Sequence, residues 1–295
     1  MPPPTEQAAF EAILEYLRQS RGFDFTAYKR SSLIRRVMKR MQSVEVAGFD
    51  AYLDYLQVHP DEFAALFNTI LINVTHFFRD PDVWEVLRTT ALPKFVESTD
   101  SSRPIRVWSA GCASGEEAYS SAIVLAELLG GDGFRDRVKI YATDVDEESL
   151  REARQAVYGH KQVAEVPPAL LEKYFEHSGS LYTFSRDLRR SVIFGRHDLL
   201  QDAPISRVDL LLCRNTLMYF NADAQTRILA RFCFSLNSGG LVVLGRAETM
   251  FSHTASFDPV DLKRRIFTVV SKANHRERLV LFAQSGREEV VRPDS

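Results

Sequence analysis

The sequence is poor in the residues that mark disulfide-rich, collagen-like or disordered chains. It has three cysteines, 14 glycines and 12 prolines in 295 residues, with 45% hydrophobic and 26% charged residues, as is typical of a globular protein. The cysteines, Cys112, Cys213 and Cys233, are odd in number and widely spaced. A disulfide framework or a Cys-x-x-Cys metal site is therefore not expected, and the chain should occupy a reduced, cytoplasmic compartment.

Long apolar runs and a dominant charge are also missing. No run approaches the roughly 18 apolar residues of a membrane span, and the first residues lack the basic start and apolar stretch of a signal peptide. We therefore expect no membrane insertion. The net charge of −2 gives no overall positive field for nucleic acid, so an electrostatic partner must be recognised by a local patch.

The first part of the chain has the periodicity of helices. Apolar residues recur every three or four positions in four segments, residues 10–19, 31–41, 49–57 and 61–71. Thr26 and the acidic cluster after Pro60 fit helix starts, because short polar side chains and acids favour free amides there. The pattern predicts a helical N-terminal domain over residues 1–72, with four or five short helices and no strand.

After a polar stretch the pattern changes to apolar runs typical of buried strands. These runs occupy residues 105–110, 138–144, 191–198, 208–215, 241–246 and 264–270. Helical segments lie between most of them, which predicts a doubly wound α/β domain with a mostly parallel sheet over residues 104–271. Ligands of such a sheet bind beyond the carboxyl ends of its strands.

Three other segments complete the predicted organisation. Residues 73–103 would be a linker that contributes to the ligand pocket. Residues 159–192 interrupt the alternation with a helix-like piece at residues 169–178 and short β-leaning pieces, which predicts an inserted β subdomain. Residues 272–295 are polar and charged, as expected for a tail or a linker.

A turn of small residues follows the first predicted strand. Ala110, Gly111, Ala113, Ser114 and Gly115 would let the backbone approach a ligand, and the amides of the following helix would favour a carboxylate or a phosphate. An ordinary tight strand-to-helix connection explains this loose glycine pattern about equally well.

Acids at the end of the second predicted strand strengthen the ligand interpretation. Asp144 lies 33 positions after Gly111, one helix and one strand further on. A carboxylate at this point can accept both ribose hydroxyls, in dinucleotide enzymes and methyltransferases alike. Either Asp144 or Asp146 could instead cap the next helix; we expect Asp146 to be the cap and Asp144 the ligand.

Other polar residues stand where a ligand could be reached. Asp198 and Leu199 offer an acid for an exocyclic amine and an apolar wall for a purine. Arg214, Asn215 and Tyr219 follow a buried strand, although helix capping and core packing explain them as well.

The segment that joins the two regions carries Asn73, Thr75 and Arg79, interleaved with Phe77 and Phe78. It is either a ligand-binding segment or a hydrophobic hinge with a surface arginine. Nothing in the residues themselves decides between these alternatives.

A basic patch lies in the second predicted helix. Residues 21–45 carry a net charge of +5, whereas the rest of the chain carries −7. Such a helix favours an acidic surface, although a solvated charged face is the common alternative. Nucleic acid is disfavoured, because the chain lacks stacked aromatic platforms.

Several catalytic templates are absent. The sequence has no G-x-S-x-G, H-E-x-x-H or G-x-x-x-x-G-K-[ST] motif, and its histidines lack ligand spacing, so no metal is expected. A dehydrogenase is disfavoured because the first strand is not followed by a full G-x-G-x-x-G.

In combination, these motifs resemble the chemotaxis receptor methyltransferases (CheR family) over roughly residues 10–270. The matching segments are residues 28–41, 73–80, 108–120, 142–146, 197–200, 213–220 and 238–245, in the family's order. The resemblance implies a class I S-adenosylmethionine-dependent methyltransferase fold with a small helical N-terminal domain and a β insertion. It also implies transfer of a methyl group from S-adenosylmethionine to glutamate side chains of chemotaxis receptors, giving glutamyl methyl esters and S-adenosylhomocysteine.

The resemblance also assigns roles to residues. Cofactor binding would involve Asn73, Thr75, Arg79, Glu117, Asp144, Asp198, Leu199, Arg214 and Asn215. Within this set Asn73, Thr75 and Arg79 would contact the methionine portion, Glu117 its ammonium, Asp144 the ribose, and Asp198 and Leu199 the adenine. Arg79 and Tyr219 would lie at the reaction centre.

Docking on the acidic methylation helices of receptors would involve Arg35, Arg36 and Arg40. Residues 245–250 depart from the family's usual Gly-His-Ser-Glu string, and the insertion lacks the glycine pattern of relatives that bind a receptor tether peptide, so tether binding is not expected. A same-fold methyltransferase for a signalling protein outside chemotaxis and a non-catalytic S-adenosylmethionine-binding regulator are the alternatives.

Overall fold

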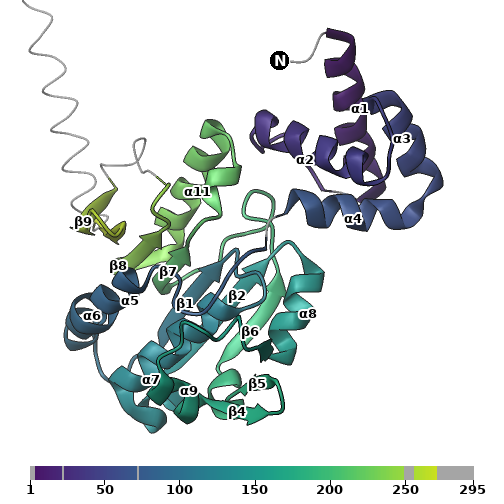
Figure 1. Cartoon of the computed structure of the whole chain (residues 1–295). Coiled ribbons are helices and arrows are strands. Elements are labelled where there is room, and N and C mark those ends of the chain that lie inside the picture. The colour runs from purple at the N-terminus through teal and green to yellow at the C-terminus, as the bar shows by residue number, and fades with distance from the viewer. Residues whose placement is uncertain (1–3, 22, 72, 249–255, 271–295) are drawn as a thin grey trace, which may run out of the picture. The chain divides into compact units, whose positions relative to one another are not determined.

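A computed structural model describes residues 4–21, 23–71, 73–248 and 256–270. The chain divides into two compact units, residues 1–74 with 217–225, and residues 75–216 with 226–295 (Figure 1). The predicted tail at residues 272–295 lies outside the described residues, as do Thr249 and Met250 of the atypical 245–250 segment.

The N-terminal stretch of the first unit forms four helices among its described residues, where the apolar periodicity predicted four or five. They are α1 (Pro4–Arg21), α2 (Arg30–Ser43), α3 (Phe49–Val58) and α4 (Pro60–Ile70). Each helix buries residues spaced by three or four, for example Leu33, Val37 and Met41 of α2, because that spacing places side chains on one helix face. Helix α1 packs on α3, and α2 packs on α4.

Helix α4 begins at Pro60 as expected, but Thr26 does not start a helix. The backbone N–H of Thr26 donates to Asp24 Oδ1 at 2.8 Å in a turn, and α2 begins only at Arg30. The turn is held by long-range partners: Asn221 N donates to Ala27 O at 2.8 Å, and the rings of Tyr28 and Phe220 lie 4.7 Å apart. Those partners come from another part of the sequence, so local capping rules do not reveal them.

The second unit contains a seven-stranded sheet in the order β6-β2-β1-β7-β8-β10-β9. The strands are β1 (Ile105–Ala110), β2 (Val138–Asp144), β6 (Val192–Arg196), β7 (Val208–Cys213), β8 (Leu236–Leu244), β9 (Phe257–Asp261) and β10 (Ile266–Val269). All neighbouring pairs are parallel except those made by β10, which runs antiparallel to β8 and β9. The predicted doubly wound α/β class is confirmed, while β9, with its short and mostly exposed segment, was not predicted.

Helices cover both faces of this sheet (Figure 1). One face packs its alternate strand residues, such as Val107 and Leu210, with residues of α5 (Pro81–Val86), a π-helical turn (Leu87–Ala91), α6 (Leu92–Glu97) and α7 (Glu116–Arg137). On the other face, Trp108 lies 5.5 Å from the ring of Phe232 in α11 (Ala222–Ser235). Helix α8 (Glu147–Gln155) follows β2, and a 3₁₀ turn (Leu217–Tyr219) precedes α11.

The insertion contains a three-stranded antiparallel sheet in the order β3-β5-β4. Its elements are β3 (Val157–Gly159), α9 (Pro168–Tyr174), β4 (Phe175–Ser178), β5 (Leu181–Phe184) and α10 (Arg186–Arg189). The helix predicted over residues 169–178 therefore ends early. Phe175 pairs with Phe184 across the hairpin, and this tertiary packing overrides the helical pattern of the segment.

Candidate active site

The turn after β1 is shaped by two glycines with left-handed backbone. Gly111 has φ +77°, and a Cβ there would collide with the side chain of Thr216. Gly115 has φ +94°, and a Cβ there would lie 3.0 Å from Ala153 Cβ. The turn therefore needs glycine for both its conformation and its close approach to neighbours, which places the start of α7 directly at the carboxyl end of β1.

Asp144 ends β2 beside this turn. Its Oδ2 accepts the N–H of Ala113 at 2.9 Å, and its Oδ1 accepts the N–H of Asp146 at 3.0 Å. Burial raises the pKa of Asp144, although these hydrogen bonds oppose the shift. The next acid caps α8, since Asp146 Oδ1 accepts the N–H of Glu148 at 2.9 Å, which confirms the predicted cap.

Glu117 lies in the first turn of α7 and is buried. Its Oε1 accepts a hydrogen bond from Ser109 Oγ at 2.9 Å, and its Oε2 lies 3.5 Å from Arg214 Nη1. Burial raises the pKa of this carboxyl; the charges of Arg214 and Arg79 and the Ser109 bond act against the shift, while Glu248 adds to it. A cationic group bound here would stabilise the carboxylate form.

Arg214 follows β7 and connects this group to the segment before α5. Its Nη2 donates to Arg79 O at 2.5 Å and to Asp80 Oδ2 at 2.8 Å. Its guanidinium carbon lies 5.6 Å from the ring centroid of Trp84. Arg214 Nε and Asn215 Oδ1 are buried and have no hydrogen-bond partner among the described residues. Buried polar atoms are normally satisfied, so these two are open to a ligand.

The predicted residues divide between the two units. Arg79, Glu117, Asp144, Arg214 and Asn215 meet around the ends of β1, β2 and β7 in the second unit. Thr75, Asp198 and Leu199 belong to the same unit; Asp198 Oδ1 accepts the N–H of Leu200 at 2.8 Å, and Leu199 is buried. Asn73 and Tyr219 belong to the first unit, so their part in the site stays a prediction.

The sequence reasoning missed three residues of this group, Ser109, Asp80 and Glu248. Ser109 had a usable signal, because it is a polar residue within the buried part of β1, residues 107–110, which is otherwise apolar. Glu248 is buried and accepts the N–H of Gly245 at 2.6 Å. Neither Asp80 nor Glu248 stands in a sequence pattern that identifies its partner.

The three predicted docking arginines of α2 lie in different surroundings. Arg40 makes two hydrogen bonds to buried Glu62, at 2.7 and 2.6 Å, and Arg36 Nη1 donates to Thr69 O at 2.9 Å. Both therefore tie α2 to α4. Arg35 is exposed and lines an open hollow between α1 and α2.

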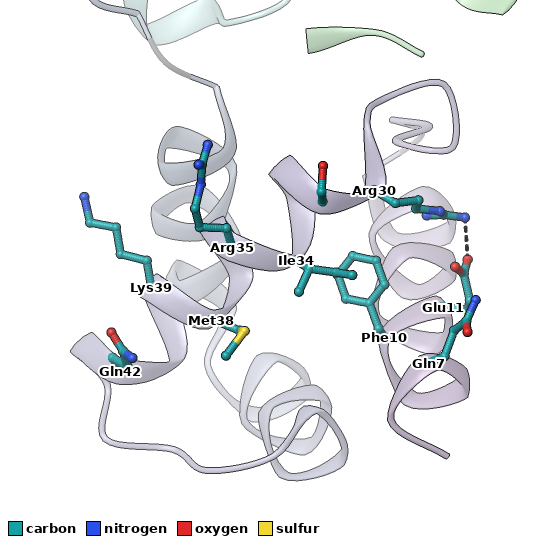
Figure 2. A pocket seen from close by; sticks show the side chains of 10 residues that line it. Gln7, Phe10, Glu11, Arg30, Ile34, Arg35, Met38, Lys39 and Gln42 are labelled. Atoms are coloured by element: carbon teal, nitrogen blue, oxygen red, sulfur yellow. Dashed lines mark hydrogen bonds and ion pairs between the residues drawn. The ribbon is translucent and has the colours of Figure 1, made fainter. Parts of the chain in front are cut away.

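This hollow, called the α1–α2 groove below, has a volume of about 820 Å³. It is lined by Gln7, Phe10, Glu11, Arg30, Ser31, Ile34, Arg35, Met38, Lys39 and Gln42. Figure 2 shows Ile34 pointing toward Phe10, with Arg35 and Lys39 to one side and the Arg30–Glu11 ion pair to the other. The groove thus combines an apolar floor with two cations at one rim, Arg35 and Lys39, for which the described residues show no ion pair.

The strand order with its single reversed strand, and the buried acids at the ends of β1 and β2, define a class I methyltransferase fold with a helical N-terminal unit. Two family models match the chain: "CheR methyltransferase, all-alpha domain" over residues 8–71 and "CheR methyltransferase, SAM binding domain" over residues 73–266. The chain belongs to the CheR methyltransferase family.

Relatives agree with this assignment. The chain is 33% identical to a "Chemotaxis protein methyltransferase" of Listeria innocua, over 80% of this chain and 88% of that protein. It is 33% identical to the protein of the same name in Escherichia coli, over 83% and 85%. It is also 35% identical, over 88% of its own length, to an uncharacterized 104.1 kDa protein of Rhodobacter capsulatus, of which it spans only 27%.

Within the described ranges, no helix is both long enough and apolar enough to cross a membrane. In the same part of the chain, no group of three or more histidine, cysteine, aspartate or glutamate side chains is arranged to hold a metal ion.

Proposed function

We propose that this chain transfers the methyl group of S-adenosylmethionine to glutamate side chains of chemotaxis receptors, forming glutamyl methyl esters in sensory adaptation. Membership of the CheR methyltransferase family and the names of the relatives support the proposal. The observation that carries it is the buried Glu117 carboxylate, flanked by Arg214 and Arg79 and adjoining the loop that Asp144 holds. The cytoplasmic location expected from the cysteines is part of the same proposal.

The residues present fit this cofactor. Glu117 would hold the ammonium of the methionine portion, because a buried carboxylate with a raised pKa gains from a cation beside it. Asp144 would bind the ribose hydroxyls, and the open Asn215 Oδ1 would accept one further hydrogen bond.

The remaining contacts are carried by the family resemblance. Asp198 and Leu199 would border the adenine, and Asn73, Thr75 and Arg79 would contact the methionine portion. Tyr219 would lie near the departing methyl group.

The proposed methyl transfer requires the protein mainly to position the two reacting groups. When bound, S-adenosylmethionine would supply an electrophilic methyl group; a carboxylate oxygen of the acceptor would take this methyl as the sulfur–methyl bond breaks, and S-adenosylhomocysteine would be the leaving group. The acceptor glutamate has an ordinary pKa near 4.3 and is already ionised at neutral pH, so no general base is needed. Arg79 and its neighbours therefore act by orienting the reacting groups and excluding water.

The receptor would dock on the α1–α2 groove. An amphipathic acidic helix could lay its apolar side on Ile34 and Met38, above the buried ring of Phe10, with its acids facing Arg35 and Lys39. Met38 is 47% exposed, so its side chain is available for contact at this surface. Arg36 and Arg40 would not contact the receptor directly; they would keep α2 in place through their hydrogen bonds to α4.

Titration calorimetry of S-adenosylhomocysteine, and separately of NAD, into the wild type and Asp144→Ala tests the cofactor. We expect micromolar binding of S-adenosylhomocysteine that falls at least tenfold in Asp144→Ala, because the variant loses the ribose acceptor and leaves the Ala113 N–H unbonded. A preference for NAD, or no binding of S-adenosylhomocysteine, would refute the proposal.

A second assay identifies the acceptor. Purified receptor cytoplasmic fragments would be incubated with enzyme and labelled S-adenosylmethionine, and base-labile label would be mapped to peptides by mass spectrometry. Labelled glutamates support the proposal. Labelling of other proteins only would point to an acceptor outside chemotaxis.

A further inference from the structure

The segment that carries Arg79 has an unusual backbone. Phe78 and Asp80, on either side of Arg79, have φ values of +52° and +56°, in the left-handed region that non-glycine residues rarely adopt. Such conformations persist only where the surroundings fix them. Here the N–H of Phe78 donates to Ser120 Oγ at 3.0 Å, and Trp84 Nε1 donates to Arg79 O at 3.0 Å.

The carboxylate of Asp80 binds two arginines at once. Its Oδ2 lies 2.8 Å from Arg214 Nη2, and its Oδ1 lies 3.3 Å from Arg246 Nε. The side chain of Arg214 is only 2% exposed and that of Asp80 is 22% exposed, so this pair is poorly screened by solvent. Arg214 lies farther from its other acid, Glu117, at 3.5 Å.

Further ion pairs connect Arg246 to the β9–β10 hairpin. Arg246 also bonds Asp82, whose Oδ2 lies 3.5 Å from Arg264 Nε, and Arg264 Nη1 lies 2.9 Å from Asp261 Oδ2. Asp261 is the outer end of this chain of charges, while Asp80 lies next to Arg214. Of the three aspartates in this chain of charges, Asp80 is the one that contacts Arg214, which also bonds the carbonyl of Arg79.

We propose that Asp80 is a positioning residue for Arg79: by holding Arg214 and Arg246, it fixes the left-handed backbone that directs Arg79 into the cofactor site. The Nη2 atom of Arg214 is shared between Asp80 Oδ2 and Arg79 O, so the carboxylate sets where that donor lies. Without the carboxylate, Arg214 Nη2 would lose the anion that holds it beside Arg79 O, and the backbone carbonyl of Arg79 would lose its fixed donor. The inference rests on the proposed function, because Arg79 is taken to contact the methionine portion of the cofactor.

The test is a double-mutant cycle on the binding of S-adenosylhomocysteine, measured by titration calorimetry on the full chain. Asp80→Asn keeps the shape and removes the charge, and we expect the dissociation constant to rise about tenfold. Arg79→Ala should weaken binding by at least as much. Because Asp80 acts through Arg79, adding Asp80→Asn to Arg79→Ala should change the constant by less than about twofold.

Asp261→Asn is the matched control. It removes the same charge from the outer end of the same chain, where Arg264 is the ion-pair partner of Asp261 among the described residues, and should leave the affinity within about twofold of the wild type. If Asp80→Asn does not fold, the cycle is repeated with Arg246→Gln, which removes the more exposed partner of Asp80. We expect a smaller loss there, about threefold, with the same dependence on Arg79.

The outcomes separate the positioning role from the proposed function. Wild-type affinity in Asp80→Asn, or a loss that adds fully to that of Arg79→Ala, would overturn the positioning role and leave the function intact. No binding by the wild type, or no loss in Arg79→Ala, would overturn both.

Discussion

Among single residues, Glu62 shows how a buried charge is kept ionised. It accepts two hydrogen bonds from Arg40 and one from Tyr52 Oη at 2.6 Å. Burial opposes the charge of Glu62, but these bonds outweigh burial, so the pKa of Glu62 lies below its usual value. A carboxyl with a lowered folded-state pKa stabilises the fold above its unfolded-state pKa, and that contribution is lost as pH falls through the folded-state value.

Arg40→Gln should therefore lower the free energy of unfolding by about 2 kcal/mol at pH 7, because it leaves a buried carboxylate without its cation. The difference from the wild type should shrink as the pH falls below about 4.5, where Glu62 becomes protonated in the unfolded chain. Urea unfolding at pH 7 and pH 4 measures both values.

Arg35→Gln is the control for this prediction. Arg35 is an exposed cation on the same helix, and its loss should change the free energy of unfolding by less than about 0.5 kcal/mol at either pH. An Arg40→Gln deficit that stays the same at pH 4 would show that the ion pair is not its cause.

At the scale of elements, the β1–α7 turn sets the geometry of the site. Gly111 N donates to Thr143 O at 2.8 Å, so the turn is bonded to the end of β2 as well as packed against Thr216. A side chain at this position meets two separate obstacles, the left-handed backbone and the collision with Thr216.

Gly111→Ala should lower the free energy of unfolding by about 3 kcal/mol, from backbone strain together with overpacking. It should also weaken S-adenosylhomocysteine binding at least tenfold, since the turn borders the proposed cofactor site. Thermal melts and calorimetry provide the two measurements.

Gly179→Ala separates the two causes. Gly179 also has a left-handed backbone, with φ +62°, but a Cβ there meets nothing within 4 Å. Its substitution should cost about 1 kcal/mol and leave cofactor affinity unchanged. Equal losses in the two variants would mean that the contact with Thr216 is unimportant.

Elements also show what the sequence could and could not predict. The spacing of apolar residues located α1 to α4, and the apolar runs located β1, β2, β6, β7, β8 and β10. Residue preferences at helix starts also predicted Asp146 as the N-cap of α8. These local patterns failed where distant residues decide the outcome, as for Phe175, which becomes a strand residue through its pairing with Phe184.

In the candidate site, too, local sequence patterns identified some residues, while contacts between distant residues could not be predicted. Asp144 and Arg214 were identifiable because polar groups at the ends of buried strands are conspicuous. The contact between Glu117 and Arg214 joins residues 97 positions apart, and no local pattern specifies it. The inward direction of Arg36 and Arg40 was likewise set by Thr69 and Glu62 of another helix, so the charge count of α2 alone could not reveal it.

At the scale of the whole molecule, proposed cofactor binding and proposed receptor docking belong mainly to different units. Most of the residues proposed to bind the cofactor, including Glu117 and Asp144, lie in the second unit, and the α1–α2 groove lies in the first. A charge change at the groove should therefore impair use of the receptor without affecting cofactor binding.

Arg35→Glu should lower receptor methylation, measured as kcat/KM for a receptor cytoplasmic fragment, by about tenfold or more at low salt. The affinity for S-adenosylhomocysteine should stay within about twofold of the wild type. The defect should diminish as salt is added, because screening weakens the electrostatic contribution in both proteins.

Arg151→Glu makes the same charge change at an exposed position of α8 and should leave receptor methylation unchanged. If Arg151→Glu were as harmful as Arg35→Glu, overall charge rather than the groove would govern docking. A parallel loss of cofactor affinity in Arg35→Glu would contradict the division between the units.

The first unit is assembled from two separate stretches of sequence, residues 1–74 and 217–225. Lys29 N donates to Tyr219 O at 2.9 Å, and the segment around Phe220 completes the packing of Tyr28. The N-terminal helices are therefore not complete without residues 217–225. A chimera that exchanges only the N-terminal helices with a relative would separate them from their own 217–225 segment, so recombination that preserves the fold has to exchange both stretches together.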